Sequence, residues 1–274
     1  MLERIKKHLI ATRLGQTIGD AADTLALRRV PLHNPEQAAA AANHIIARRL
    51  IRGVCPTGGQ FLDVGAHIGS VLASVHRTDR SIRIAAIEAD PDKAAFLRRQ
   101  YPFVHLVECA AGERAGRAEF FTYAAGSGYN SLAQTQGDAP SRRIEVAVER
   151  LDDVLADISP DLIKIDVEGA ELGVLIGAEV LVARARPVIM FESVGLQTNA
   201  LGYAPGMIWD WLDAHGYAVR TPDRVAHDCA ALGRESFLDA HAYPFRSHDY
   251  FAIPHEKAES VRDRARRILR VHAP

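Results

Sequence analysis

Cysteine is scarce in this chain. The three cysteines among 274 residues, Cys55, Cys109 and Cys229, are odd in number and far apart in the sequence. This spacing excludes a disulfide framework and a CxxC metal motif, and a reducing cytoplasm is the expected location. The twelve histidines are also scattered without close ligand spacing. We therefore expect no zinc site.

An excess of charge of either sign is lacking as well. Lys and Arg number 33 and Asp and Glu number 34, which leaves a net charge of -1. A chain without a global positive field is not expected to bind nucleic acid. Long apolar runs are also missing, since none approaches the ~20 residues that a membrane-spanning helix needs. No integral membrane span is predicted.

What the chain does have is an alternation of strand-like and helix-like segments after its first 55 residues. Hydrophobic residues make up 48% of the sequence, which is enough for one large core. Nearly continuous apolar strands alternating with helices predict an α/β fold with a doubly wound, mostly parallel sheet. We expect a helical segment over 1–55, the main domain over 56–254 and a basic amphipathic helix over 255–274.

The predicted strands are short apolar or alternating runs; they are 61–64, 82–87, 104–107, 117–123, 143–150, 162–167, 187–191 and 248–253. The predicted helices carry apolar residues at helical spacing or start at a capping residue; they are 34–52, 68–75, 91–100, 170–184 and 205–215.

A glycine-rich turn follows the first of these strands. The sequence at 63–69 reads DVGAHIG. Gly65 permits a tight turn and lets a ligand approach the backbone, while Gly69 lets the next helix pack close to the sheet. The GxxxG spacing differs from the GxGxxG of dinucleotide-binding folds. Taken alone, the motif is equally typical of an ordinary strand-to-helix turn.

A carboxylate and two small residues follow the next two strands. Glu88 ends the second strand, where a carboxylate can accept hydrogen bonds from both ribose hydroxyls of a nucleoside. The alternative role, capping the following helix, is already filled by Asp90. After the third strand, Cys109 and Ala110 leave room for a flat adenine, although an ordinary strand exit has the same residues.

Charged residues lie inside and after two further strands. Period two places Lys164 and Asp166 on one face of a strand, and Glu168 follows it. A lysine in a buried strand is costly unless it is paired or functional. The residues therefore indicate either a catalytic group or an internal Lys164–Asp ion pair with a capping Glu168. Glu192, at the end of a neighbouring strand, adds a carboxylate at the same edge.

Together these motifs carry a resemblance to a known family. The segments FLDVGAHIGSVL at 61–72, AIEADP at 86–91, ECAAG at 108–112, RLDD at 150–153 and DLIKIDVEGAELGVLIGA at 161–178 resemble the FkbM family of methyltransferases. The order and spacing match over about 58–195. At His67 the family usually has Asn, which puts in doubt the contact to the amino-acid end of the cofactor but not the turn.

The resemblance implies a seven-stranded class I (Rossmann-like) methyltransferase that uses S-adenosylmethionine. It further implies methylation of a hydroxyl oxygen on a sugar, a glycan or a small natural product. The expected cofactor-binding residues follow the matching motifs; they are Asp63, Gly65, His67, Gly69, Glu88, Ala89, Cys109, Ala110 and Asp166. Residues 1–55 lie outside the resemblance and are expected to form part of a substrate lid.

For catalysis we expect Asp166 or Glu192 to act as base or to orient the acceptor, with Lys164 fixing the charge state. A carboxylate-bound Mg²⁺ could instead acidify the acceptor hydroxyl. Three alternatives remain open at this stage: an NAD-dependent oxidoreductase, a non-catalytic cofactor-binding protein and an RNA ribose methyltransferase. The near-zero net charge disfavours the last of these. The sequence also leaves a homo-oligomer open.

Overall fold

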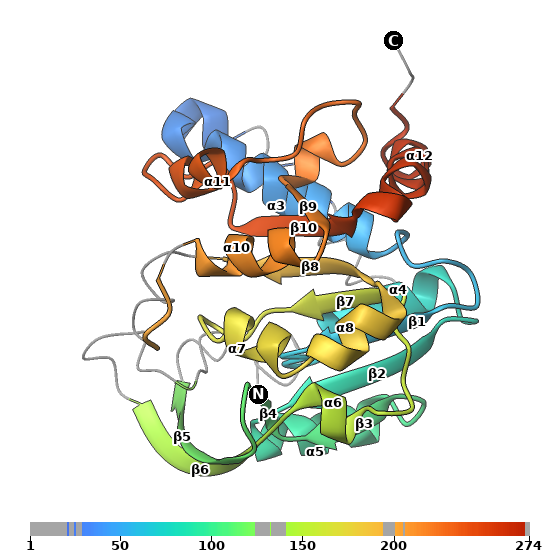
Figure 1. Cartoon of the computed structure of the whole chain (residues 1–274), viewed down its shortest axis with the longest axis vertical. Helices are drawn as coiled ribbons and strands as arrows, with labels where there is room; N and C mark the ends of the chain where they lie inside the picture. Colours follow the sequence, from blue (N-terminus) through green and yellow to red (C-terminus); the bar gives the residue numbers. More distant parts are fainter. Residues whose placement is uncertain are drawn as a thin grey trace.

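The fold comes from a computed structural model, which describes residues 21, 25, 29–123, 132, 141–193, 201–204 and 206–271. Its centre is a seven-stranded sheet with the order β3-β2-β1-β7-β8-β10-β9 (Figure 1). The strands are β1 (Gln60–Val64), β2 (Arg83–Glu88), β3 (His105–Glu108), β7 (Leu162–Ile165), β8 (Val188–Glu192), β9 (Tyr217–Arg220) and β10 (Asp249–Pro254).

The central sheet is mostly parallel, as predicted. β1 pairs in parallel with β2 and β7, and the outer neighbours β3 and β8 continue the same direction. β10 is antiparallel to both β8 and β9. The carboxyl ends of the parallel strands therefore meet at one edge, where open α/β sheets bind their ligands.

A second sheet, with the order β4-β6-β5, lies beside the carboxyl end of the first. It consists of β4 (Ala110–Ala111), β5 (Gly116–Tyr123) and β6 (Ser141–Glu149). β5 and β6 confirm the two added strands predicted near 117–123 and 143–150. β4 was not predicted, because two small residues show no periodicity.

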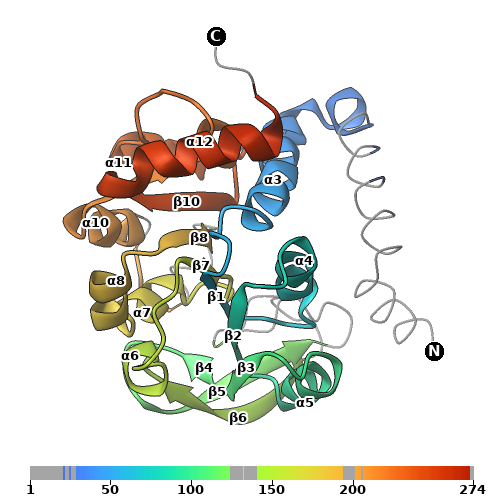
Figure 2. The same cartoon turned by 90° about the vertical axis from the view of Figure 1, so that its right-hand side faces the viewer.

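Helices cover both faces of the central sheet, which confirms the doubly wound fold (Figure 2). One face carries α3 (Ala38–Ile51), α4 (Ser70–Thr78), α5 (Pro91–Gln100) and α12 (Ala258–Leu269). The other face carries α6 (Leu151–Val154), α7 (Glu171–Ile176), α8 (Glu179–Ala185), α10 (Met207–Ala214) and α11 (Arg234–Ala240). Each face has its own buried apolar cluster, so the sheet is apolar on both sides.

One predicted helix, 170–184, is two helices in the structure. Gly177 separates α7 from α8, and a Cβ there would lie 2.0 Å from the carbonyl oxygen of Gly112. The carboxylate of Asp152 accepts hydrogen bonds from the backbone N–H of Val180 (3.2 Å) and Leu181 (2.8 Å). This long-range contact satisfies donors at the start of α8, and the apolar periodicity of the segment does not show it.

The described part of the predicted N-terminal segment packs onto the sheet. After a short 3-10 helix (Pro35–Gln37), α3 places Ala47, Leu50 and Ile51 in the same buried cluster as Leu72 of α4. Residues 1–20, 22–24 and 26–28 lie outside the described residues, so the lid remains a prediction.

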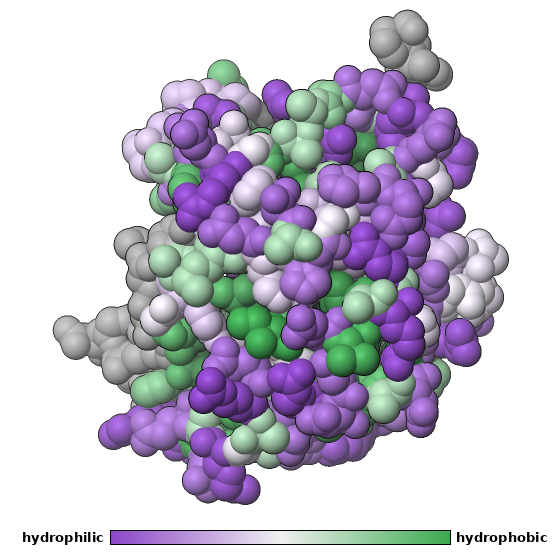
Figure 3. Space-filling view, in the orientation of Figure 1, coloured by the Kyte–Doolittle hydropathy of each residue, from purple (hydrophilic) through white to green (hydrophobic). Residues whose placement is uncertain are grey.

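The outer surface in the orientation of Figure 1 is mostly hydrophilic, with an apolar patch over α7 and α8 (Figure 3). Val180 of α8 is 61% exposed. None of the described helices has the length and apolar composition that crossing a membrane requires.

Candidate active site

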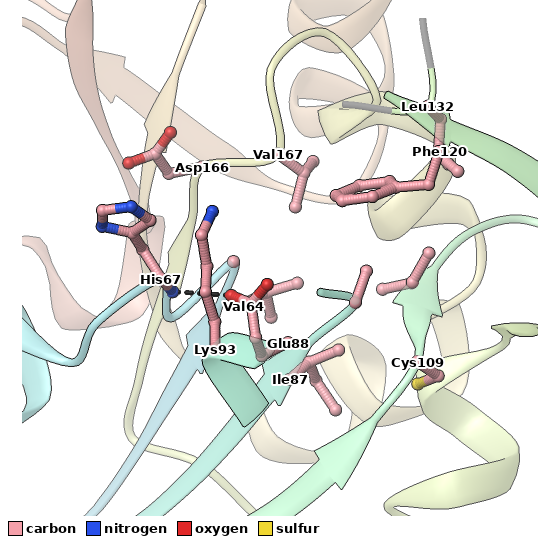
Figure 4. A pocket seen from close by; sticks show the side chains of 14 residues that line it. Val64, His67, Ile87, Glu88, Lys93, Cys109, Phe120, Leu132, Asp166 and Val167 are labelled. Carbon is pink, nitrogen blue, oxygen red and sulfur yellow. Dashed lines mark hydrogen bonds between the residues drawn. The ribbon is translucent and has the colours of Figure 1, made fainter. Parts of the chain in front are cut away.

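A cavity opens where β1, β2, β4 and β7 end (Figure 4). It includes about 510 Å³ of space between atoms, part of which is open to bulk solvent. The predicted cofactor-binding residues that line it are Gly65, His67, Glu88, Ala89, Cys109, Ala110 and Asp166. The other lining residues are Val64, Ile87, Lys93, Ala111, Phe120, Leu132 and Val167.

Two predicted cofactor-binding residues, Asp63 and Gly69, do not line this cavity. Asp63 is 1% exposed and faces Lys164 inside the sheet. Gly69 precedes α4 with φ +77°, and a Cβ there would lie 2.5 Å from the ring of Tyr101 and 2.8 Å from Leu97. Gly69 thus lets the start of α4 pack closely against the end of α5, whereas the prediction was close packing against the sheet.

The turn at Gly65 holds two strand ends in contact. Gly65 has φ +80°, and a Cβ would lie 2.0 Å from the carbonyl oxygen of Asp166. The backbone N–H groups of Gly65 and Ala66 both donate to the carbonyl of Ile87, at 3.0 and 3.1 Å. Only glycine combines this backbone angle with such an approach. The residue is therefore required by the chain itself, whether or not a ligand is bound.

Glu88 lies at the floor of the cavity and is held by backbone donors. Its Oε2 accepts a hydrogen bond from the N–H of His67 (2.7 Å), and its Oε1 accepts one from the N–H of Asp90 (2.9 Å). Each carboxylate oxygen retains a further acceptor site. Burial raises the pKa of Glu88 to about 7, although the charge of Lys93 and both backbone bonds act in the opposite direction. The carboxylate is thus fixed in place and can accept two more hydrogen bonds.

Most of the other lining residues are apolar. Ala89, Cys109 and Ala110 contribute small side chains to the lining. Phe120 of β5 projects toward Val167 (Figure 4). Burial raises the pKa of the Cys109 thiol to about 12, so it contributes a neutral, weakly polar surface. This wall can accommodate a flat aromatic ring.

Sequence reasoning missed Phe120 and Lys93 as lining residues. Phe120 belongs to the second sheet, and the residue pattern of its strand does not show where this sheet lies relative to the cavity. Lys93, in the first turn of α5, extends from the level of Glu88 toward that of Asp166 and forms an ion pair with Asp90 (3.8 Å). Its position soon after the second strand was the available signal.

A buried ion-pair network adjoins the cavity at β7. Nζ of Lys164 lies 2.9 Å from Oδ2 of Asp166 and 3.6 Å from Oδ1 of Asp63, its partner on the neighbouring strand. Burial acts to lower the pKa of Lys164, but the two carboxylates raise it above its ordinary value. Burial would raise the pKa of Asp166, yet the charge and hydrogen bond of Lys164 hold it below its ordinary value. Lys164 and Asp166 are therefore both charged at neutral pH.

Glu192 joins this network from the end of β8. Its carboxyl group hydrogen-bonds Asp166. Burial, followed by the charges of Asp166 and Glu168, raises the pKa of Glu192 to about 10. This shift favours the protonated form of Glu192, which can donate to Asp166. The structure thus brings the three predicted catalytic residues, Lys164, Asp166 and Glu192, together.

Glu168 and Glu171 occupy the loop that follows β7. Glu168 does not cap α7, whose cap position is Ala170; it has φ +57° instead. Oε1 of Glu171 accepts hydrogen bonds from the N–H of Val167 (3.2 Å) and Gly169 (3.0 Å). Glu171 thus fixes the backbone next to Asp166, a role that sequence reasoning missed.

The profile of the Methyltransferase FkbM domain family matches residues 63–219, which is more than half of the chain. The chain belongs to the FkbM methyltransferase family. The matched segment contains Gly65, Glu88, Asp166 and Glu192, and it includes all the motifs that carried the resemblance except the first two residues of the segment 61–72.

Solved structures of methyltransferases are similar to the chain. One is methyltransferase FkbM from Methylobacillus flagellatus KT, with 20% identity, a TM-score of 0.41, and coverage of 71% of this chain and 43% of that protein. Another is precorrin-6y C5,15-methyltransferase from Geobacter metallireducens GS-15, with 22% identity, a TM-score of 0.38, and coverage of 65% and 73%. The chain thus spans less than half of the length of the Methylobacillus protein. No curated protein matches the chain.

Family membership and sheet topology together confirm the predicted fold type. The order β3-β2-β1-β7-β8-β10-β9, with β10 antiparallel, is the seven-stranded sheet of a class I methyltransferase. The FkbM motifs occupy the carboxyl edge of this sheet, where Gly65, Glu88 and Asp166 line one cavity.

Proposed function

We propose that this member of the FkbM family uses S-adenosylmethionine to methylate a hydroxyl oxygen of a sugar, a glycan or a small natural product. The observation that carries the proposal is the cavity itself. Its carboxylate at Glu88, its apolar slot and the charged groups at its far end match the three parts of the cofactor: ribose, adenine and sulfonium.

The residues present fit this cofactor in their chemistry. Glu88 has an open acceptor site on each oxygen for the two ribose hydroxyls. Ala89, Cys109, Ala110 and Phe120 would enclose the adenine ring. The Gly65 turn and His67 would meet the amino-acid end. Asp166, ionised and 38% exposed at its side chain, supplies negative charge where a sulfonium would lie.

When bound, S-adenosylmethionine supplies an electrophilic methyl group. The chain then has to align an acceptor oxygen with that methyl group and handle its proton. We propose that Asp166 and Glu192 contact the acceptor, as base or as orienting groups, and that Lys164 keeps Asp166 ionised. The protonated Glu192 is suited to donating a hydrogen bond, and the ionised Asp166 to accepting one.

A bound Mg²⁺ remains an alternative prediction for the same carboxylates. Among the residues that the structure describes, Asp166, Glu168 and Glu192 are the one group of three or more potential ligands whose ligand atoms all lie within 4.8 Å of one another. Lys164 and the proton on Glu192 already reduce the negative charge of this group. We therefore expect turnover to persist in a chelator, and a strict need for added Mg²⁺ would favour the alternative.

Calorimetry on the full chain tests the proposed cofactor. Titrations with S-adenosylmethionine, S-adenosylhomocysteine and NADH should show binding of the first two only. A methyl-transfer screen of sugar and small-molecule hydroxyl acceptors, followed by S-adenosylhomocysteine release, then tests the reaction. Binding of NADH alone would favour the oxidoreductase alternative. Binding of S-adenosylmethionine without transfer to any acceptor would favour a non-catalytic cofactor-binding protein.

A further inference from the structure

A histidine and an aspartate form a pair beside the acceptor side of the candidate site. Nδ1 of His44, on α3, lies 2.9 Å from Oδ2 of Asp249, the first residue of β10. The histidine side chain is 61% exposed, whereas that of the aspartate is 11% exposed. A carboxylate only accepts hydrogen bonds, so this contact places a proton on Nδ1 and makes Nε2 the basic nitrogen of the neutral ring.

This pair adjoins the charged network at the end of β8. Asp249 is directly opposite Glu192 in the antiparallel pairing of β10 with β8. Directly opposite residues project to the same side of a sheet, with Cβ atoms about 4.5–5.5 Å apart. Figure 2 shows α3 beside β10 and β8, in agreement with this placement. Glu192 hydrogen-bonds Asp166, and β8 lies between β7 and β10, so the pair lies two strands beyond Asp166, on the side away from Glu88.

The residue next to His44 fixes α3 in this position. Asn43 is buried and donates from its side-chain nitrogen to the carbonyl of Arg246 (2.9 Å). Its side-chain oxygen accepts a hydrogen bond from the N–H of Asp223 (2.9 Å). Both partners belong to segments that flank β10 or β9. The histidine is therefore held on a rigid element rather than on a loop.

The two carboxyl groups nearer the cavity are poorly suited to removing a proton. Asp166 is engaged by Lys164, which weakens it as a base. The raised pKa of Glu192 favours its protonated form, which cannot accept a proton. An imidazole oriented by a carboxylate is the side chain that ordinarily accepts a proton near neutral pH.

We propose that His44, held by Asp249, is the general base that takes the proton of the acceptor hydroxyl. The proposal rests on the proposed methyltransferase function. The acceptor O–H bond breaks and its proton passes to Nε2 of His44, while the oxygen forms the new bond to the methyl carbon. The sulfur keeps the electron pair of the broken C–S bond. The positive charge lost at sulfur thus reappears on the imidazolium, where Asp249 stabilises it.

The tautomer of His44 can be measured without an acceptor. The measurement is nitrogen NMR of the full chain, labelled with ¹⁵N-histidine and saturated with S-adenosylhomocysteine. At pH 8 the proposal requires His44 to carry its proton on Nδ1. Asp249→Asn should shift the ring toward the Nε2–H form, and His44→Asn assigns the signal. An Nε2–H ring in the unaltered chain would overturn the proposal.

Turnover of a hydroxyl acceptor found in the screen tests the role in catalysis. His44→Asn should lower turnover by about 10²–10⁴-fold. Its affinity for S-adenosylmethionine by calorimetry should stay within about threefold of the unaltered chain. His227→Asn is the matched control and should change neither quantity, because His227 is exposed and lines a separate pocket with Ile253 and His255, at the end of β10 away from Asp249. Near-normal turnover of a folded His44→Asn variant would also overturn the proposal.

Calorimetry separates the two ways of failing. If the unaltered chain does not bind S-adenosylmethionine, the proposed function itself is wrong. If it binds the cofactor and His44 carries its proton on Nε2, or its loss leaves turnover intact, only the role of His44 is wrong.

Discussion

The two halves of the carboxyl edge of the central sheet differ in the chemical groups that they present. Over β1 and β2, which we call the cofactor half after its proposed role, backbone groups, apolar side chains and Lys93 surround the carboxylate of Glu88. Over β7, β8 and β10, which we call the acceptor half after its proposed role, Lys164, Asp166, Glu192 and Asp249 lie close together. The first half is suited to holding a ligand in one pose, and the second to moving charge.

The two halves also differ in how far apart their residues lie in the sequence. Gly65 and Glu88 of the cofactor half belong to consecutive β-α units, and the N–H of His67 links their loops. His44 and Asp249 of the acceptor half are separated by 205 positions. A local motif can therefore specify the first half, whereas the second exists only once the chain has folded.

The largest effect is expected at Asp166, in the acceptor half. Asp166→Asn removes the ionised partner of Lys164 and of the Glu192 proton. Turnover should fall by about 10²–10⁴-fold, because the acceptor and its proton are no longer held in place. Calorimetry should show a far smaller change in cofactor affinity, since Glu88 and the Gly65 turn are unaltered.

Substitutions at Glu192 sharpen the same test. If Glu192 acts in its protonated form, Glu192→Gln keeps a donor toward Asp166 and should lose about tenfold at most, whereas Glu192→Ala should lose far more. Equal losses in both variants would mean that Glu192 acts as a base. If a variant at Asp166 or Glu192 has a lower melting temperature but normal turnover, the role of the network is structural.

The next effect belongs to the cofactor half. Glu88→Ala should weaken the binding of S-adenosylmethionine by ~1.5–3 kcal/mol, because it removes a charged acceptor of hydrogen bonds. Turnover at saturating cofactor should change much less than in Asp166→Asn. Unchanged affinity in a folded variant, measured by calorimetry, would remove Glu88 from the cofactor site.

A smaller effect should appear as a pH dependence of cofactor affinity. The pKa of Glu88 is raised to about 7, and hydroxyl donors favour its ionised form. Affinity should therefore be highest above pH 7 and fall as the pH is lowered through 7, by about tenfold per unit at most. The same titrations on Glu88→Gln provide the control, and they should show a flat profile. A dependence that persists in this variant belongs to another group.

The sequence predicted the sheet better than the breaks within its covering helices. β2, α5 and β8 lie within one or two residues of their predicted ranges because apolar runs and an Asp-Pro start mark them directly. The break between α7 and α8 depends on Asp152, a residue from a different element. β9 is short and follows a turn, so periodicity alone did not reveal it.

For the site, the sequence predicted residues that end strands and missed those that other elements bring in. Glu88, Asp166 and Glu192 follow or end predicted strands, and parallel strands share their carboxyl edge. Phe120 comes from the second sheet, and the proposed base His44 comes from a helix that precedes the matched family segment. Their positions depend on how whole elements pack, which no local pattern of residues shows.

The smallest effect is expected at Glu171, between the two halves. Both of its hydrogen bonds to the loop end on Oε1, which glutamine retains, so Glu171→Gln should leave cofactor affinity and turnover within about threefold at pH 7.

Burial raises the pKa of Glu171 to about 7 from an ordinary value of 4.5. The folded chain therefore binds the proton more tightly than the unfolded chain does, and the resulting stability is complete below about pH 4.5 and lost as the pH rises through 7. The free energy of unfolding of the unaltered chain should fall across this window, by up to about 1.4 kcal/mol per pH unit from this group. Its melting temperature should fall with it. Glu171→Gln should show a shallower slope, while Glu171→Leu, which leaves both N–H donors without their acceptor, should be less stable at every pH. Identical slopes in the unaltered chain and in Glu171→Gln would mean that this carboxyl group stays ionised, and that the loop next to Asp166 is held by charge rather than by a neutral acceptor.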